Sequence, residues 1–395
     1  MKQIDDVFPA YINATIGPCS NLRRFVANKD YMLQRGYEFN LYTRDFLLGG
    51  SLQTPVNYSK GLGFRSYLKS IFRKSKLFSV LFLIREQREA EKLMKAYLAL
   101  DRDPDVIIFH ELDSAYYYLK HRKGKKAKVG LFHESDGIRL KMTFESYPKL
   151  RHTLWAKKRY KKSVLVDNAV DRNIFISFIS KENFVKENPD IPLERNVAFH
   201  NGIDMLPVNC VSKVTNFKYN LCITGTVCKR KGQYIIVEAL NLISEEAKKK
   251  IHVSVIGEGN DLDALKEKVK TYGIEDNISF LGLMPNSEVH NYLCGCDIYI
   301  LMSNSEGLPI SIIEGMRAGL AVISTPIAGI PEEVGEDNGL LINPDAKELA
   351  EVFENIDTYD WKSYGVGSRK KFEKEFTFDA MINSYCDVMD NLFNK

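Results

Sequence analysis

The second half of the chain alternates short apolar segments with helix-like ones at a regular spacing, and this alternation restricts its fold most. Between residues 219 and 345 the strand-like segments read YNLCITG, IHVSVIGEG, NISFLGL, DIYILMS, LAVISTP and GLLINP. Short apolar runs of this kind are typical of strands buried on both faces of a parallel sheet. The pattern predicts an α/β domain with a doubly wound sheet and right-handed crossovers.

The first half repeats this pattern less regularly. Its strand-like segments are FPAYINAT (8–15), YEFNLYTR (37–44), DVIIFHE (105–111), KVGLFHES (128–135) and NIFISFIS (173–180). A chain of 395 residues exceeds the size at which one hydrophobic core stops growing. The irregular stretch LPVNCVSKVTN marks a boundary near residue 205. We expect two Rossmann-like domains, at 1–204 and 205–370, facing each other across a cleft, and a C-terminal amphipathic helix at 371–395.

The formal net charge of +4 conceals a difference between the two halves. Residues 1–200 hold 36 Lys and Arg against 22 Asp and Glu, a balance of +14, and the remainder holds 19 against 29, a balance of −10. Opposite charges suggest two roles, so we expect the basic half to meet an anionic partner. Its basic segments are FRSYLKSIFRKSKLF (64–78), KHRKGKKAK (120–128) and WAKKRYKKS (155–163).

The N-terminal segment MKQIDDVFPAYINAT has acids where a signal peptide has a long apolar stretch. No apolar run in the first half approaches the ~20 residues of a membrane span. The seven cysteines include no CxxC pair, which is typical of reduced thiols in a cytosolic protein. We therefore expect a cytoplasmic protein.

Two glutamates in SEGLPISIIEG (305–315) indicate a ligand site. A buried strand precedes them, Gly307 permits a tight turn, and Pro309 suits the first position of a helix whose free amides favour an anion. Glu314 lies roughly 7–8 Å further along that helix. Carboxylates on both sides of an anion site fit a molecule with hydroxyls at both ends and phosphates between, such as a nucleotide-sugar. A solvated loop glutamate and a helix glutamate paired with lysine would explain the spacing equally well.

The segment SEGLPISIIEGMRAGLAVISTPIAGIPEEV resembles the signature of the retaining glycosyltransferases of family 4, which have the GT-B fold of two Rossmann-like domains. That signature is a glutamate, seven residues and a second glutamate, with Gly-x-Pro between them and a Gly-x-Pro-Glu turn after, here GIPEE, Gly329 to Glu333. The resemblance extends upstream through GEG (257–259), ISFLG (278–282) and NGID (201–204), and so covers residues 197–345.

The resemblance implies a role for each matching residue. Glu306 would face the donor hexose, Glu314 the ribose hydroxyls, and the amides around Leu308 and Pro309 the phosphates. His133, after the strand GLFH, would contact the hexose. Gly17, in the loop after the first strand, would approach the donor and the acceptor closely. The family's C-terminal helices cross back and pack on the N-terminal domain, so we expect this for 371–395.

The loop GTVCKRKGQ (225–233) resembles the family's Gly…Arg/Lys-Lys-Gly turn. Many members have arginine directly after the first glycine, Gly225, where this chain has Thr226. We therefore assign the stabilisation of the leaving diphosphate to Arg230 and Lys231, without ranking the two. Fixed cations remove the need for a metal ion. The Asp-x-Asp pairs at 101/103 and 103/105 precede a strand, and the pair at 261/263 stands at the start of a helix, where acids suit the helix dipole. We therefore expect no metal and no cofactor.

The implied function is retaining transfer of a hexose from a nucleoside diphosphate sugar, UDP being commonest in the family, to a hydroxyl of a glycan or lipid-linked acceptor. Capsule or lipopolysaccharide assembly is the expected setting. Segments 64–78 and 155–163 would contact an anionic membrane surface, on the inner face of the membrane. A nucleotide-sugar epimerase or phosphorylase, and a basic nucleic-acid-binding protein, remain alternatives. No aromatic RNA-binding motif is present, so we expect no nucleic acid. The sequence does not indicate an oligomeric state.

Overall fold

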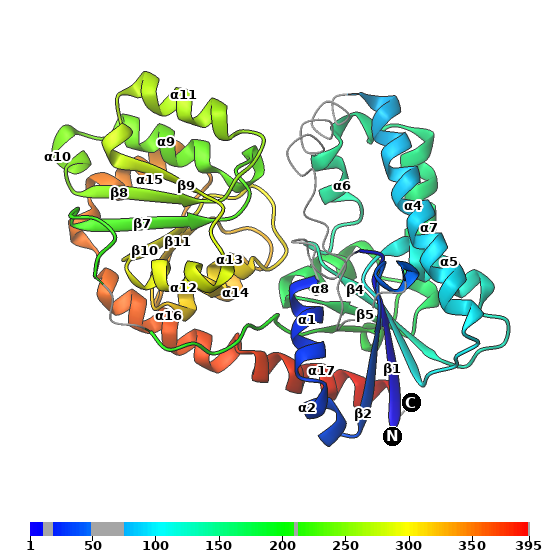
Figure 1. Cartoon of the computed structure of the whole chain (residues 1–395). Helices are drawn as coiled ribbons and strands as arrows, with labels where there is room; N and C mark the ends of the chain where they lie inside the picture. Colours follow the sequence, from blue (N-terminus) through cyan, green and yellow to red (C-terminus); the bar gives the residue numbers. More distant parts are fainter. Residues whose placement is uncertain (11–18, 49–74, 209–211, 394–395) are drawn as a thin grey trace. The chain divides into compact units, whose positions relative to one another are not determined.

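The computed structural model describes residues 1–10, 19–48, 75–208 and 212–393. The chain forms two compact units (Figure 1). Residues 1–199 and 382–395 make up unit 1, and residues 200–381 make up unit 2. The division after residue 199 lies near the boundary that we expected at about residue 205, and the last 14 residues return to unit 1.

Unit 1 is built on a parallel sheet of six strands in the order β2-β1-β3-β4-β5-β6. The order reverses direction at β1, as in doubly wound folds. Its strands are β1 (Lys2–Val7), β2 (Tyr37–Tyr42), β3 (Val106–Phe109), β4 (Lys128–His133), β5 (Arg172–Phe175) and β6 (Asn196–Ala198). The β3 and β5 residues are buried throughout, as the apolar runs predict.

The first strand lies earlier than the sequence predicts. We expected it at FPAYINAT, but it spans Lys2–Val7, and only residues 8–10 of the expected segment are described. The strand contains two acids, Asp5 and Asp6, and both are buried. Asp5 accepts hydrogen bonds from Arg102 and Tyr97, and Asp6 pairs with His110. Because both acids have partners that are distant in the sequence, this segment can form a buried strand.

Helices cover both faces of this sheet (Figure 1). They are α1 (Cys19–Ala27), α2 (Lys29–Gln34), α4 (Lys76–Ala99), α5 (Leu112–His121), α6 (Lys141–Ser146), α7 (Leu154–Ala169), α8 (Phe178–Glu187) and the part of α17 (Phe378–Phe393) from Ile382 onward. The segment NLRRFVANKDYMLQRG (21–36) predicts a single helix, and this prediction is wrong because the structure has two helices here, α1 and α2. The helical segment is interrupted at Asn28, whose side-chain amide donates to the carbonyl of Arg24 and thereby ends α1.

Unit 2 contains a second parallel sheet of six strands, in the order β12-β11-β10-β7-β8-β9. Its strands are β7 (Tyr219–Thr224), β8 (Ile251–Ile256), β9 (Ile278–Gly282), β10 (Ile298–Leu301), β11 (Ala321–Ser324) and β12 (Gly339–Leu341). The order reverses direction between β7 and β10. All six strand-like segments of the sequence are strands of this sheet, so the predicted α/β fold is confirmed.

In Figure 1 the helices of unit 2 lie on both faces of this sheet, α9, α11 and α15 on one and α12, α13 and α16 on the other. The helices of unit 2 are α9 (Gln233–Leu242), α10 (Glu245–Lys248), α11 (Leu262–Tyr272), α12 (Asn286–Cys294), α13 (Ile310–Arg317), α14 (Ile330–Glu333), α15 (Ala346–Glu354) and α16 (Trp361–Glu375). The continuous C-terminal helix that the sequence predicts is two helices, α16 and α17. They are separated at Phe376 and Thr377 because the backbone there pairs with Ile203.

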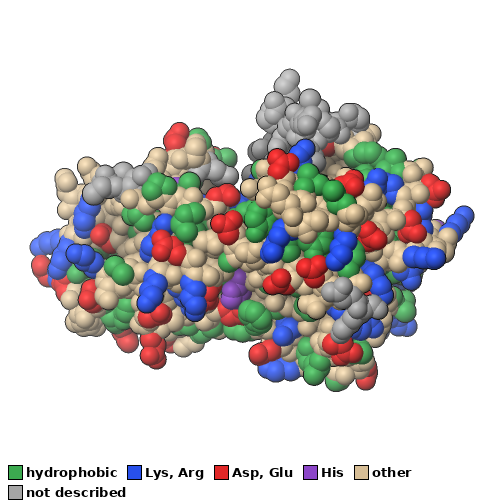
Figure 2. Space-filling model, turned by 90° about the horizontal axis from the view of Figure 1, so that it is seen from below, with side chains coloured by type: hydrophobic (Ala, Val, Ile, Leu, Met, Phe, Trp, Pro, Cys, Tyr) green, Lys and Arg blue, Asp and Glu red, His purple; other side chains and the backbone are tan. Residues whose placement is uncertain are grey.

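The charged side chains are mixed over the face of the molecule that Figure 2 shows, where Lys and Arg alternate with Asp and Glu. Among the described residues, no helix combines the length and the apolar composition that crossing a membrane requires.

Candidate functional site

The carboxyl ends of the strands in unit 2 carry four loops that lie at one edge of the sheet. They are residues 225–232 after β7, 257–261 after β8, 302–309 after β10 and 325–329 after β11. Ligands of open parallel sheets bind at this edge, where the strand order reverses. The reversal here lies between β7 and β10, whose loops carry the basic turn and the glutamate motif.

The backbone of these loops packs too closely for a side chain at Gly257 and at Gly232. A Cβ on Gly257, which has a φ of +141°, would lie 2.0 Å from the carbonyl oxygen of Gly225. A Cβ on Gly232 would lie 1.9 Å from the carbonyl oxygen of Met302. The amide of Val227 donates to the carbonyl of Glu258 at 3.0 Å. The basic loop is therefore held between the loop after β8 and the loop after β10.

Glu306 is the centre of this site. Its Oε1 accepts from the hydroxyl of Ser303 at 2.7 Å and lies 2.8 Å from both Arg230 Nη1 and Lys231 Nζ. Arg230 Nη1 also donates to the carbonyl oxygen of Ser305, and the amide of Asn304 donates to the carbonyl of Arg230. The structure thus brings together three of the residues that the sequence predicts, from two loops separated by some 75 positions.

The charge of Glu306 is set by opposing effects. Burial acts to raise its pKa, but Lys231 and Arg230, together with hydrogen bonds from Lys231 and Ser303, lower the pKa of this carboxyl below its ordinary value. Glu306 is therefore ionised at neutral pH. Its side chain is 9% exposed, Lys231 is 12% exposed and Arg230 is 36% exposed, so Arg230 is the cation nearer to solvent.

The turn before α13 is buried and tightly tied to its neighbours. Gly307, Leu308 and Pro309 are all buried, and the carbonyl of Gly307 accepts from the amide of Gly329 at 2.8 Å. We expected Pro309 at the first helical position of α13, but Pro309 is the N-cap residue and the helix begins at Ile310. Glu314 lies half-buried on α13.

Glu333, the second glutamate of GIPEE, is a residue for which the sequence predicts no role. Glu333 is completely buried at the end of α14, and neither carboxyl oxygen has a hydrogen-bond partner among the described residues. Burial, with the nearby charges of Glu306 and Glu332, raises its pKa well above the ordinary value. Glu333 is therefore a neutral acid beside an ionised one. The signal was a charged residue between Pro331 and Val334, in a segment whose neighbours are apolar.

The aspartates of the Asp-x-Asp pairs bind backbone amides and a lysine. Asp261 precedes α11, and its carboxylate accepts from the amide of Lys229 at 2.8 Å, which fixes the basic loop. Asp103 accepts from the amides of Lys126 and Ala127, and Asp101 pairs with Lys125. Within the described ranges, no three His, Cys, Asp or Glu side chains form a group that could hold a metal ion.

In unit 1, His133 ends β4 and is largely enclosed. Its ring stacks on Phe175 at 4.6 Å between centroids, and its Nε2 lies 3.1 Å from the amide oxygen of Asn173. Burial lowers the pKa of His133 despite the charge of Asp167 nearby, so the ring is neutral at pH 7. The predicted donor residue Gly17 lies outside the described residues.

The predicted membrane segments are only partly described, since residues 64–74 are not. Segment 155–163 lies in α7, where two of its cations face inward. Arg159 and Lys162 both pair with Asp113, which is buried at the start of α5. Burial opposes these pairs, but they lower the pKa of Asp113 below its ordinary value. Part of the basic charge in this segment therefore joins α7 to α5.

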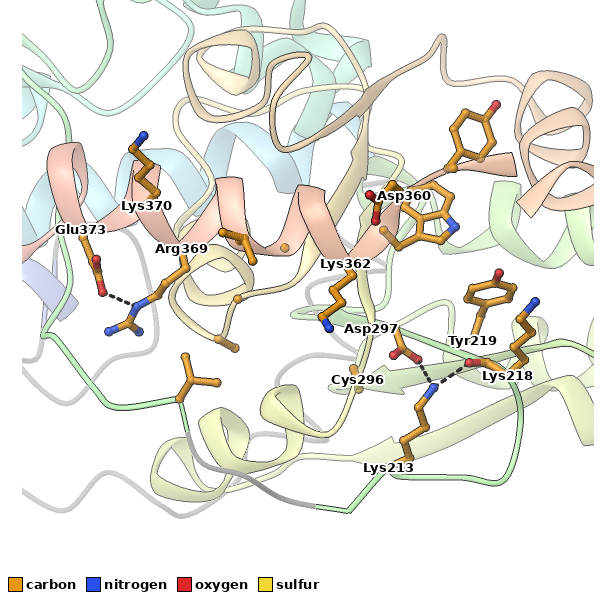
Figure 3. A pocket seen from close by; sticks show the side chains of 17 residues that line it. Lys213, Lys218, Tyr219, Cys296, Asp297, Asp360, Lys362, Arg369, Lys370 and Glu373 are labelled. Carbon is orange, nitrogen blue, oxygen red and sulfur yellow. Dashed lines mark hydrogen bonds and ion pairs between the residues drawn. The ribbon is translucent and has the colours of Figure 1, made fainter. Parts of the chain in front are cut away.

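A cavity of about 850 Å³ in unit 2 lies at the opposite edge of the sheet, away from the glutamate motif (Figure 3). Tyr219 and Asp297, at the amino ends of β7 and β10, line it. Figure 3 shows Lys213 bound to Asp297 and to the carbonyl of Lys218, and Arg369 bound to Glu373. A smaller cavity of about 410 Å³ lies between α9 and α11, beside Lys229.

Comparison with known proteins identifies unit 2. Residues 214–358 match the family model described as glycosyl transferases group 1. This part of the chain is therefore similar to the group 1 glycosyltransferases. The match spans the basic loop, Glu306, Glu314 and the Gly-x-Pro-Glu turn, which are the residues on which the predicted resemblance depends.

Two relatives extend the similarity beyond this domain. An uncharacterised glycosyltransferase of Methanocaldococcus jannaschii is 25% identical over 303 residues, which are 71% of this chain and 72% of that protein. The putative colanic acid biosynthesis glycosyltransferase WcaL of Escherichia coli is 29% identical over 217 residues, which are 51% of this chain and 52% of WcaL. The matched region thus spans about half the length of the second relative.

Solved structures resemble the chain over its whole length. Sucrose-phosphate synthase from Thermosynechococcus elongatus gives a TM-score of 0.73 at 16% identity, with all of both chains covered. Anabaena HepE in complex with UDP gives 0.67 at 15% identity, covering 99% of this chain and all of that one. At such identities the likeness shows the fold, and the predicted GT-B fold with two Rossmann-like units is confirmed.

Proposed function

We propose that this protein is a metal-independent, retaining glycosyltransferase that transfers a hexose from a nucleoside diphosphate sugar to an acceptor hydroxyl. The observation that carries the proposal is the cluster of Arg230 and Lys231 on Glu306, at the carboxyl edge of the sheet in a domain similar to the group 1 glycosyltransferases. UDP is the proposed nucleotide, which the complex of UDP with the structurally similar HepE supports.

The proposed chemistry uses the fixed charges of the site. As the bond between sugar and phosphate breaks, negative charge grows on the departing diphosphate. Arg230 offers several donors in a plane and Lys231 a point charge, and both would hold this charge without a metal ion. An ionised Glu306 cannot donate a proton, so its role is to accept a hydrogen bond from a hexose hydroxyl. Glu314 would accept hydrogen bonds from the ribose.

Retention at the anomeric carbon is consistent with the same arrangement. Glu306 is bound by two cations and a hydroxyl, which makes it a poor nucleophile. We propose that the acceptor hydroxyl attacks on the face that the diphosphate leaves, with a phosphate oxygen taking its proton. Negative charge on the diphosphate would build up next to Arg230, Lys231 and the buried turn before α13. These groups would thereby stabilise the transition state.

The proposed setting is the assembly of a cell-surface polysaccharide or glycolipid on the cytoplasmic face of a membrane. The name of the matched WcaL protein supports this setting. The acceptor would be a glycan or a lipid-linked sugar. The basic balance of residues 1–200 fits an acceptor that carries phosphate or lies on an anionic surface.

A screen of donors tests this function. UDP-, GDP- and ADP-sugars are added to the full chain in the presence of EDTA, and thermal stabilisation and hydrolysis of the sugar phosphate bond are measured for wild type and Glu314→Ala. Stabilisation by one nucleotide, lost in the variant, supports the proposal and names the donor. No response to any nucleotide, together with salt-sensitive binding to nucleic acid, would overturn it.

A further inference from the structure

Unit 1 contains a second cluster of ionisable side chains, at the carboxyl edge of its own sheet. His110 directly follows β3, Glu134 directly follows β4, and Asp6 is the penultimate residue of β1. β1 pairs with β3 and β3 pairs with β4, so these side chains come from adjacent strands. This is the edge at which parallel sheets bind ligands.

The imidazole of His110 bridges the two carboxylates. Its Nε2 lies 3.1 Å from Asp6 Oδ2, and its Nδ1 lies 3.3 Å from Glu134 Oε1. Burial acts to lower the pKa of His110, but the two carboxylates outweigh it and raise the pKa to about 10. Both ring nitrogens are therefore protonated donors, and His110 is a buried cation that fixes the direction of both carboxylates.

Aromatic side chains enclose this cluster. The His110 ring stacks on Phe132 at 4.8 Å between centroids, and Phe8 meets it edge-on at 5.8 Å. Tyr385, on α17, stacks on Phe132 at 6.4 Å, and its buried hydroxyl has no partner within the described ranges. Burial and the charge of Asp6 raise the pKa of Tyr385, which is therefore a neutral hydroxyl near the cluster.

Asp5, the residue before Asp6 in β1, is a buried acid with a structural role. Arg102 binds both oxygens of Asp5, Tyr97 donates to Oδ2 and Asn40 donates to Oδ1. Every oxygen of Asp5 has a partner, as expected of a group that only supports the fold.

The cluster around His110 is not satisfied in this way. Asp6 is 1% exposed, and its Oδ1 has no hydrogen-bond partner among the described residues. The side chain of Glu134 is 22% exposed. Among the described residues, only His110 contacts its carboxylate, through Oε1. The second oxygen of Glu134 is a hydrogen-bond acceptor open to solvent, on a carboxylate held in place by a buried cation. An exposed acceptor on a carboxylate whose other oxygen contacts His110 is suited to bind a hydroxyl.

We propose that Glu134 binds a hydroxyl of the acceptor substrate, and that His110 and Asp6 are positioning residues that hold its carboxylate in place. The substrate class is a polyhydroxylated molecule, a sugar or polyol, because an ionised carboxylate accepts hydrogen bonds from hydroxyls and repels phosphate. This inference rests on the proposed transferase function and assigns its acceptor site.

The experiment measures release of nucleoside diphosphate from the donor that the screen identifies, with and without a hydroxyl probe. The probes are glycerol and the methyl glycosides of glucose, galactose and mannose. The variants are Glu134→Gln, Glu134→Asp and His110→Gln, and the matched control is Glu194→Gln, an exposed glutamate in the turn before β6. Nucleotide affinity is measured in parallel by calorimetry, because it reports unit 2 and the fold.

The proposal predicts that at least one probe accelerates diphosphate release by wild type. Glu134→Gln and His110→Gln raise the KM for that probe by about tenfold or more, and Glu134→Asp recovers part of the loss. Nucleotide affinity stays at the wild-type value in each variant, and Glu194→Gln matches wild type throughout. A KM within about twofold of wild type in Glu134→Gln, or no acceleration by any probe, would overturn the assignment. Failure of wild type to bind any nucleotide would instead overturn the transferase function itself.

Discussion

The ammonium group of Lys231 lies 2.8 Å from the carboxylate of Glu306, and both side chains are largely buried. Arg230 binds the same oxygen from a more exposed position. The carboxylate thus pairs with the same cations that we assign to the diphosphate. Binding of a donor would replace part of this pairing with phosphate contacts. Because Lys231 is more buried than Arg230, the stability of the fold should depend more on Lys231.

Lys231→Ala is expected to lower the free energy of unfolding by ~3 kcal/mol, because it leaves a buried carboxylate without one of its charges. Arg230→Ala should cost ~1 kcal/mol or less, since its exposed guanidinium is screened by water. Urea unfolding of the two variants measures this difference. Equal losses would contradict the view that Lys231 is the structural partner of Glu306.

Glu333→Gln should stabilise the protein increasingly as the pH rises. The pKa of Glu333 is raised in the folded state, so its stabilising contribution is complete below the ordinary pKa and is lost as the pH rises toward the folded one. The variant loses this dependence, by up to about 1.4 kcal/mol for each pH unit between the two pKa values. Thermal unfolding between pH 4 and pH 8 tests it, with exposed Glu336→Gln as the control. An equal gain at every pH would refute it.

The titration of His110 should also make the free energy of unfolding depend on pH. Its pKa is raised to about 10, so its contribution to stability is complete below the ordinary value and is lost between about pH 6.5 and about pH 10. His110→Gln should remove this loss, and wild type and variant should converge toward pH 10. The control is His121→Gln, whose ring contacts the carbonyl of Tyr117. Parallel stability curves for wild type and His110→Gln would show that the ring carries no charge.

Gly257→Ala should disrupt the site where Gly273→Ala does not. A methyl group at Gly257 would meet the carbonyl of Gly225 at 2.0 Å, whereas Gly273, at a φ of +64°, has nothing within 4 Å of its Cβ position. Gly273→Ala should therefore cost only the ~1 kcal/mol of a left-handed residue. Gly257→Ala should cost more and also weaken nucleotide binding, because the basic loop must move. Calorimetric titration of both variants with UDP compares them.

The sequence predicts the fold of unit 2 well because its strands are buried on both faces and are continuous apolar runs, as in DIYILMS. It fails at β1, where Asp5 and Asp6 find partners about one hundred positions away, and no local pattern shows such pairing. The same limit applies to the site. The motif places Glu306 and the basic loop at the same edge of a sheet, but only the structure shows that one oxygen of Glu306 binds both Arg230 and Lys231.

Two residues show what the sequence could not supply. Glu333 stands in a turn that the family resemblance covers, yet nothing in its spacing shows that it is completely buried. His133 was expected beside the hexose, and its predicted contact with the donor stays a prediction. The structure adds that the ring contacts Asn173 and two phenylalanines, and that burial lowers its pKa.

The most direct test of the central claim is calorimetric titration of the full chain with UDP in EDTA, for wild type, Lys231→Ala and Lys229→Ala. Both variants remove one positive charge from the same loop, but Lys229 is exposed and lies beside the separate cavity between α9 and α11. The account predicts that wild type and Lys229→Ala bind alike, and that Lys231→Ala binds at least about tenfold more weakly. Equal affinity in all three proteins, or binding by wild type only when a divalent metal replaces EDTA, would contradict it.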